Sequence, residues 1–446
     1  MKIEKIESGV GHPGDLKAVP RKKGFWALNW LRFILAIYIV LFHTLKNYPA
    51  IDGTWYEAAL GLGNMATSLF FALSGFLLTY AYVVKKNGQR VDTRNFLIAR
   101  FSTLYPLHIA GLLLSLVPVV YAIYNRGGMS VPIDVSGTAT RMLDQGEFLL
   151  ALAMNALLLN AWNPYYLSFN YPSWSLSALA CYYLVFPVIA PGIYRMKSPI
   201  AAIVLLGVVF LLPGAIADAL HRTDVFTDGL LHRNPIIRLP LFVAGMVLCV
   251  LFARSRNVGS ALQVGSLVTV MVATVAIAVV LRHEGAHLHM IKNGLYYPSS
   301  LALIWLCVCI PPTSNRWLTY WGERLGAASL PLFLLHGPLF SLFRVCERYC
   351  CAVLASAEWN VGAIAALSRT IEQSVPVFPV YLVLLVIICI VVQERVVAPL
   401  QVTIRNYLSH RKGSDVEKKT ELALREPVVP EANLPVAGSH NSTARL

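Results

Sequence analysis

The sequence predicts an all-α, polytopic membrane bundle of about ten transmembrane helices with one short helix on the outer side. Composition is the first observation, because 57% of the residues are hydrophobic and only 13% are charged, against roughly 25% charged in soluble proteins. The second is a series of apolar runs near the ~20 residues that a helix needs to cross a ~30 Å hydrocarbon core. These runs are continuously apolar, which indicates helices and excludes a β-barrel.

Ten apolar runs are long enough to be read as spans, and an eleventh is not. The short run is 148–160, FLLALAMNALLLN, which contains Asn155, so its flanking charges must decide whether it crosses. The ten expected spans are 27–45, 60–83, 103–123, 174–193, 199–217, 235–252, 262–281, 295–311, 325–345 and 376–396.

The basic residues fix the orientation of these spans. The connection between the second and third spans carries the most lysines and arginines, and with the N-terminus inside it lies in the cytoplasm. The later basic connections and the basic tail also fall inside if 148–160 does not cross, and all of them invert if it does. We therefore expect 148–160 to be an interfacial or re-entrant outer helix, with both termini cytoplasmic in the inner (plasma) membrane.

Three regions follow from this pattern. Residues 1–24 form a polar cytoplasmic arm without an evident cleavage site, 25–400 form the membrane domain, and 401–446 form a cytoplasmic tail with a disordered composition. The net charge of +14 lies mainly at the ends and in short connections, which indicates positive-inside topology and not a nucleic-acid partner. The sequence leaves open the oligomeric state and any disulfide among Cys346, Cys350 and Cys351.

Two ionisable residues lie within the first span, near the two ends of the stretch LRFILAIYIVLFH at 31–43. Arg32 and His43 are eleven positions apart, which corresponds to about 1100° of helical rotation, or ~20° net, and a rise of ~16 Å. They therefore share one helix face at opposite depths. Such residues usually face a cavity or the bundle interior. The plainer alternatives are that Arg32 reaches the phosphate headgroups and that His43 hydrogen-bonds a neighbouring helix.

Three further candidates lie in the second and third spans. Ser74 and Gly75 form a small-residue patch, which suits a substrate pocket or, more simply, close helix packing. Arg100 begins the third span, where an arginine can bind an anionic group or can serve only as a topology determinant.

The fourth and ninth spans hold the remaining candidates. Trp174, Ser175 and Ser177 form a polar, aromatic entry from the outer side, and an interfacial aromatic belt with a helix cap is the alternative. His336 lies beside Gly337 and Pro338 in mid-membrane, where it has room to meet a ligand or to satisfy a freed carbonyl.

The segment HEGAH at 283–287 matches the H-E-x-x-H pattern of zinc proteases. That pattern needs both histidines on an ordered helix, and Gly285 weakens a helix in what is expected to be a short outer connection. His289 is also out of step for a third ligand. We expect no metal site.

Taken together and in this order, the motifs resemble the acyltransferase 3 family of integral-membrane O-acyltransferases over about residues 25–400. The resemblance implies transfer of an acyl group, commonly acetyl, from cytoplasmic acyl-CoA to a hydroxyl of a glycan or another acceptor. The matching features are Arg32 with His43, FALSGF at 71–76, Arg100 before LYP at 104–106, PSWSLS at 172–177 and LPLFLLH at 330–336.

The resemblance also implies roles for the candidates. Arg32 and Arg100 bind the phosphates of CoA, and His43 is the general base for the acceptor hydroxyl. Direct transfer is the simpler scheme, and a covalent intermediate at Ser74 stays open. Acyl-CoA is a donor substrate and no bound cofactor is expected. The implied partners are the lipid bilayer, acyl-CoA and a carbohydrate acceptor, such as a surface or exported polysaccharide, its lipid-linked precursor or a small glycosylated natural product.

The chain departs from the family pattern at two positions. Thr103 stands where a second arginine is common, and Leu179 stands where a glutamate often follows WSLS. A carboxylate for His43 would then have to come from a loop residue such as Asp52 or Glu57. A proton-coupled transporter, the main rival, predicts mid-span carboxylates and two related halves, and the sequence has neither.

Overall fold

The computed structural model describes residues 25–408, with gaps at 136, 256–258, 284–288, 357–359 and 373. The predicted all-α membrane bundle is confirmed, because nine helical segments in the described part of the chain are long and apolar enough to cross a membrane. The N-terminal arm (1–24) and the tail from 409 lie outside the described residues.

The nine long segments contain the following helices. They are α1 Trp26–His43, α3 Gly63–Tyr82, α4 Thr93–Arg126, α6 Trp174–Arg195, α7 Pro199–Ala219, α9 Pro235–Arg254, α10 Ala261–His283, α13 Arg316–Ala355 and α15 Phe378–Val392, which continues through the π-helix η7 Gln393–Val397 to Leu408. Shorter helices are α2 Trp55–Leu60, α5 Gln145–Ala156, α8 Val225–Arg233, α11 His289–Lys292, α12 Tyr297–Cys309 and α14 Val361–Thr370. One hairpin pairs β1 Ser130–Pro132 with β2 Thr140–Met142 in antiparallel register.

The eighth of the ten expected spans, 295–311, forms only the 13-residue helix α12. Proline sets both limits, since Pro298 occupies the first turn and Pro311 and Pro312 follow the end. Thirteen residues rise ~20 Å, about two-thirds of the hydrocarbon core. The helix nevertheless connects α10 and α11 to α13 and packs on α3, α9 and α10, which shelter it inside the bundle.

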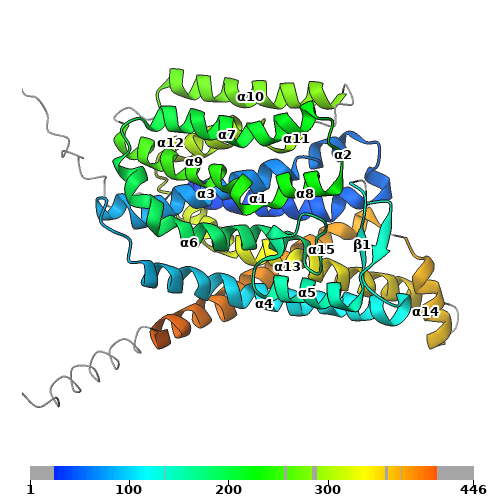
Figure 1. The fold of residues 1–446 in the computed structure, drawn as a ribbon. Coiled ribbons are helices and arrows are strands. Elements are labelled where there is room, and N and C mark those ends of the chain that lie inside the picture. The colour runs from blue at the N-terminus through cyan, green and yellow to red at the C-terminus, as the bar shows by residue number, and fades with distance from the viewer. Residues whose placement is uncertain are drawn as a thin grey trace, which may run out of the picture.

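The short run 148–160 does not form a span, as expected. Its helix, α5, begins with a capping box in which Asp144 and Glu147 bind each other's backbone N–H groups. Its last turn holds Asn155, whose carbonyl accepts from His108 Nε2 at 2.7 Å and whose amide donates to Ser168 at 2.9 Å. These buried hydrogen bonds hold α5 along α4 (Figure 1).

The described chain begins and ends at the same end of the bundle (Figure 1). We call it the Phe25 end. Trp26 Nε1 donates there to the Pro311 carbonyl (3.0 Å), and Arg324 pairs with Glu394 (2.6 Å). The opposite end, which we call the His43 end, holds the C-terminus of α1.

Glycines allow α3 and α9 to cross backbone against backbone. A Cβ built on Gly75 would lie 2.0 Å from the carbonyl oxygen of Phe242, and one on Gly245 would lie 1.8 Å from that of Ala72. No real Cβ approaches a backbone atom so closely, so each position requires glycine. The helix-packing alternative for Gly75 is therefore what the structure displays.

We expect Gly75→Ala to destabilise the protein, because the added methyl must push α3 away from α9. Overpacking of this kind costs about 1–3 kcal/mol, which thermal unfolding of the detergent-solubilised chain measures. Gly265→Ala in α10 is the matched control, since a Cβ there meets nothing within 4 Å. Equal unfolding midpoints for the two variants would contradict the packing argument.

Candidate functional site

A cavity of about 440 Å³ lies among α1, α3, α4, α6 and α13. Along α3 it extends from Ala81 near the Phe25 end to Thr67, a rise of ~21 Å. Phe25 lines it at one end, and Phe333 of α13 lines it as well. The cavity therefore extends along most of the length of α3.

Three cations line this cavity: Arg32, Arg100 and Lys85, the last from the 3₁₀ turn Val84–Lys86. Arg100 donates to the Tyr82 hydroxyl at 2.8 Å, while its buried Nε has no hydrogen-bond partner within the described chain. No carboxylate occurs among the described lining residues. Because charge buried in low dielectric needs a counter-charge, this region suits an anionic ligand.

The predicted residues His43 and His336 meet at the other end of the site. His43 Nδ1 lies 3.1 Å from His336 Nε2, and the two rings stack with centroids 5.1 Å apart and planes 10° from parallel. His336 is fully buried, and its Nδ1 lies 3.1 Å from the Leu332 carbonyl oxygen. A hydrogen-bond partner of His43 is thus a second histidine, 293 residues away, where the sequence suggested a loop carboxylate such as Asp52 or Glu57.

These contacts determine where the protons of the neutral pair lie. A carbonyl oxygen only accepts, so His336 Nδ1 carries the proton and donates to Leu332. His336 Nε2 is then the acceptor for the Nδ1–H of His43. His43 consequently carries its lone pair on Nε2, which is the arrangement of a histidine oriented to act as a base.

The carbonyl freed by the Gly-Pro break beside His336 is satisfied by another side chain. Pro338 has no N–H, so the carbonyl of Leu334 loses its helical donor and accepts instead from the Asn170 amide at 2.9 Å. Tyr381 of α15 donates to the carbonyl of His336 at 2.8 Å. The backbone around His336 is fixed from both sides, and His336 itself does not have to satisfy the freed carbonyl.

Aromatic rings separate the cavity from the histidines. Phe333 and Phe70 both line the cavity and lie 5.9 Å apart between centroids. The Phe333 ring is 6.4 Å from that of His336, which is one helical turn further along α13. The cavity therefore ends one turn short of the histidine pair.

Ser74 lies too far from His43 to be activated by it. Gly63 packs against the Phe42 ring, so the start of α3 is level with the end of α1. Ser74 is eleven residues beyond Gly63, a rise of ~16 Å. This hydroxyl lines the cavity near the depth of Arg32, which favours direct transfer over a covalent intermediate at Ser74.

The remaining candidates from the fourth span have different places. Ser175 lines the cavity and donates to the Pro172 carbonyl at 2.9 Å. Ser177 donates to the carbonyl of Leu158 at 2.5 Å and accepts from a backbone N–H of the same loop. Trp174 is buried against Phe71, at 6.0 Å between ring centroids. The structure thus brings Ser175 to the cavity and gives Ser177 and Trp174 packing roles.

Comparison with known proteins decides the family. The family model of the acyltransferase domain matches residues 25–394, most of the chain. The chain belongs to the acyltransferase 3 family. This membership makes it an acyltransferase enzyme and excludes the transporter alternative.

Relatives match smaller parts of the acyltransferase. This chain is 34% identical over 158 residues to "Protein 2 in picA locus" of Rhizobium radiobacter, and the match covers 34% of this chain and 75% of the relative. It is 30% identical over 175 residues to "Acyltransferase MdmB" of Streptomyces mycarofaciens, and that match covers 38% of this chain and 40% of the relative. An uncharacterized protein of Haemophilus influenzae is 21% identical over 249 residues, 54% of this chain and 93% of that protein. No solved structure matches the chain.

The acyltransferase also has a buried cation that the sequence analysis missed. Arg238 of α9 is fully buried; it donates to the His232 carbonyl (2.9 Å), to His232 Nδ1 (3.1 Å) and to Ser68 Oγ (3.0 Å). His232 in turn packs against Trp174, with ring centroids 4.8 Å apart. The available signal was an arginine in the first turn of an expected span, where ionisable residues are rarely incidental.

The HEGAH segment at 283–287 is described only at its first residue. Its first residue, His283, ends α10, and residues 284–287 lie outside the described part of the chain.

We expect His336→Ala to lower acyl transfer by about 10–100-fold, because a hydrogen bond to a charged group contributes about 1.5–3 kcal/mol. His336→Gln retains an acceptor for His43 Nδ1–H and should recover part of that loss. Transfer rates in membranes, normalised to protein amount, measure both. Full activity in His336→Ala would show that His43 does not depend on His336.

Proposed function

We propose that this acyltransferase transfers an acetyl group from acetyl-CoA to a hydroxyl of a carbohydrate acceptor. One observation carries the proposal: a single cavity begins among three cations and ends one helical turn from an oriented histidine pair. A donor with an anionic head and an extended arm fits that shape. The preferred acceptor is a cell-surface or exported polysaccharide or its lipid-linked precursor.

The donor would lie along the cavity. Arg32, Arg100 and Lys85 would bind its phosphates through charge-assisted hydrogen bonds. From the level of Arg32 to that of His43, α1 rises ~16 Å, which the pantetheine arm would follow past Ser74 toward Phe333. The thioester would then reach the region of His43 and His336.

The transfer itself would be direct. His43 Nε2 takes the proton of the acceptor hydroxyl while the acceptor oxygen attacks the thioester carbonyl carbon. The new C–O bond forms, the C–S bond breaks, and the CoA sulfur leaves as a thiolate that receives the proton back from His43. His336 accepts from His43 Nδ1–H throughout and stabilises the positive charge that His43 acquires.

The cytoplasm would face the Phe25 end. Basic residues gather there, including Lys85, Arg195 and Arg254, in keeping with positive-inside topology. Acetyl-CoA would enter from that side, and the acceptor would approach His43 from the other side of the plasma membrane. Both termini are then cytoplasmic.

Aromatic side chains at the His43 end support a sugar acceptor. Trp162, Tyr165 and Tyr171 are 39%, 58% and 55% exposed in the loop before α6, where flat apolar faces can stack on sugar rings. Phe169 and Trp174 of the same region are buried and are not available for stacking.

We expect Arg100→Gln and Arg32→Gln each to weaken acetyl-CoA binding by about 10–100-fold, since a hydrogen bond to a charged group contributes about 1.5–3 kcal/mol. Titration of the purified chain with acetyl-CoA gives the Kd. Arg141→Gln is the matched control, because Arg141 is an exposed arginine that pairs with Glu147. If both cavity variants bind as the wild type does, the donor lies elsewhere.

We expect cells that carry His43→Ala to lose the acetyl groups that the intact protein adds to surface glycans. A missing general base lowers the rate by about 10²–10⁴-fold, and mass spectrometry of the glycans measures the loss. Protein abundance in the membrane must match the wild type. Unchanged acetylation at equal abundance would sink the catalytic role of His43.

A further inference from the structure

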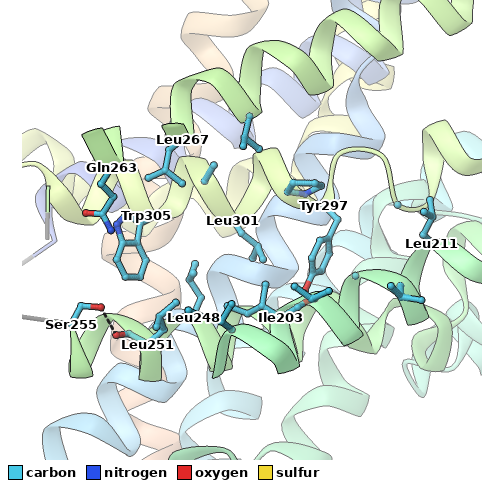
Figure 2. A pocket seen from close by; sticks show the side chains of 18 residues that line it. Ile203, Leu211, Leu248, Leu251, Ser255, Gln263, Leu267, Tyr297, Leu301 and Trp305 are labelled. Carbon is cyan, nitrogen blue, oxygen red and sulfur yellow. Dashed lines mark hydrogen bonds between the residues drawn. The ribbon is translucent and has the colours of Figure 1, made fainter. Parts of the chain in front are cut away.

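A second cavity, of about 680 Å³, lies among α7, α9, α10 and α12 (Figure 2). It shares no lining residue with the first cavity. Its walls are aliphatic, with Ile203, Leu248, Leu251 and Leu301 among them. Both α7 and α10 expose apolar side chains on the outside of the bundle, such as Val204 at 61% and Val272 at 62%. The cavity is therefore a groove that opens sideways to the hydrocarbon of the bilayer.

The length of the groove matches one leaflet. It begins at the Phe25 end, where Ser255 follows α9 and Ile200 lies in the first turn of α7, and it reaches Leu211. Ile200 to Leu211 spans ~16 Å of helix rise, about half of the ~30 Å hydrocarbon core. A single straight hydrocarbon chain of one leaflet fits this length.

Hydrogen-bond donors gather at the end near the membrane surface. Trp305 is 5% exposed, lines the groove, and its Nε1–H has no partner within the described chain. Gln263 lies at the same end of the groove (Figure 2). Its Oε1 accepts from the Gly259 N–H at 2.8 Å, so the side chain offers its NH₂ as a donor. A ligand here needs an acceptor oxygen at the head of an apolar chain.

Positive charge lies beside that end. Arg254 occupies the last turn of α9 directly before Ser255, and it is held by the backbone carbonyls of Tyr194 and Met196. Arg195 and Lys197 flank the same junction between α6 and α7. The surroundings of the groove entrance thus complement an anionic headgroup.

We propose that this groove binds one acyl chain of an anionic membrane phospholipid from the leaflet at the Phe25 end. An ester or phosphate oxygen of the lipid accepts from Trp305 Nε1–H, and the phosphate lies near Arg254. A long isoprenoid carrier would need a groove that continues beyond Leu211. Since α10 contacts the bundle chiefly through α12, the lipid chain fills the space between α10 and α7 and holds α10 in place.

Photo-crosslinking tests the proposal on the full chain in vesicles of phosphatidylethanolamine and phosphatidylglycerol, with a trace of phosphatidylglycerol that carries a diazirine in one acyl chain. We expect adducts to concentrate on residues of α7, α9, α10 and α12 that line the groove. Trp305→Phe removes the donor and keeps most of the ring, so adducts there should fall about 5–10-fold, the equivalent of one hydrogen bond of about 1–1.5 kcal/mol.

A matched pair on α7 separates groove binding from ordinary lipid contact. Val204 lines the groove and Leu205 does not, although the two are 61% and 63% exposed. Val204→Trp should block the groove and remove its adducts, whereas Leu205→Trp should not. Three results would each overturn the proposal. The two tryptophan variants could give equal adducts, or adducts could be spread evenly over α15 as well as the groove helices. A long-chain isoprenyl phosphate could also suppress the adducts more strongly than phosphatidylglycerol does. None of these readouts depends on the acyl-transfer reaction.

Discussion

The hydrogen bond between His43 and His336 is the contact on which the geometry of the site depends. It joins α1 to α13, and it orients a base only because the Leu332 carbonyl holds the proton of His336 on Nδ1. Asn170 satisfies the Leu334 carbonyl that Pro338 leaves without a helical donor, and Tyr381 donates to the His336 carbonyl, so the backbone of this turn is held on both sides. A polar group in a membrane interior must be satisfied by protein, so each partner in this chain of contacts constrains the next.

Both positions at which the sequence departs from the expected family pattern lie in the cavity. Thr103 and Leu179 both line the cavity that holds Arg32, Arg100 and Lys85. The residues that they replace in the family pattern are an arginine and a glutamate. Exchanging both removes one positive and one negative charge from the same low-dielectric space, so the excess of cations is unchanged. On the proposed function, the cavity therefore still favours an anionic donor, and a histidine in place of a carboxylate supports His43.

The sequence predicted what depends on local spacing and missed what depends on packing. The helical repeat placed Arg32 and His43 on one face of the first span. The basic residues of the connections predicted that 148–160 does not cross the membrane, and it forms no span in the structure. The pairing of His43 with His336 required the α1–α13 contact, which no local pattern specifies. The prolines on either side of α12 could have predicted its short length. A glycine at position 75 is compatible with both a pocket and a close helix crossing, so the sequence could not distinguish them.

On the proposed mechanism, Phe333 has to move during the reaction. Its ring lies between the cavity and His336, at 6.4 Å from the histidine ring, whereas reacting atoms must come within about 3–3.5 Å of each other. A thioester that enters past Ser74 reaches the acceptor oxygen only when Phe333 and Phe70 turn aside. Until these rings turn, they keep a thioester in the cavity away from the histidine pair and from water at His43. When the rings turn, the acceptor hydroxyl is the nucleophile beside His43, which favours acyl transfer over hydrolysis.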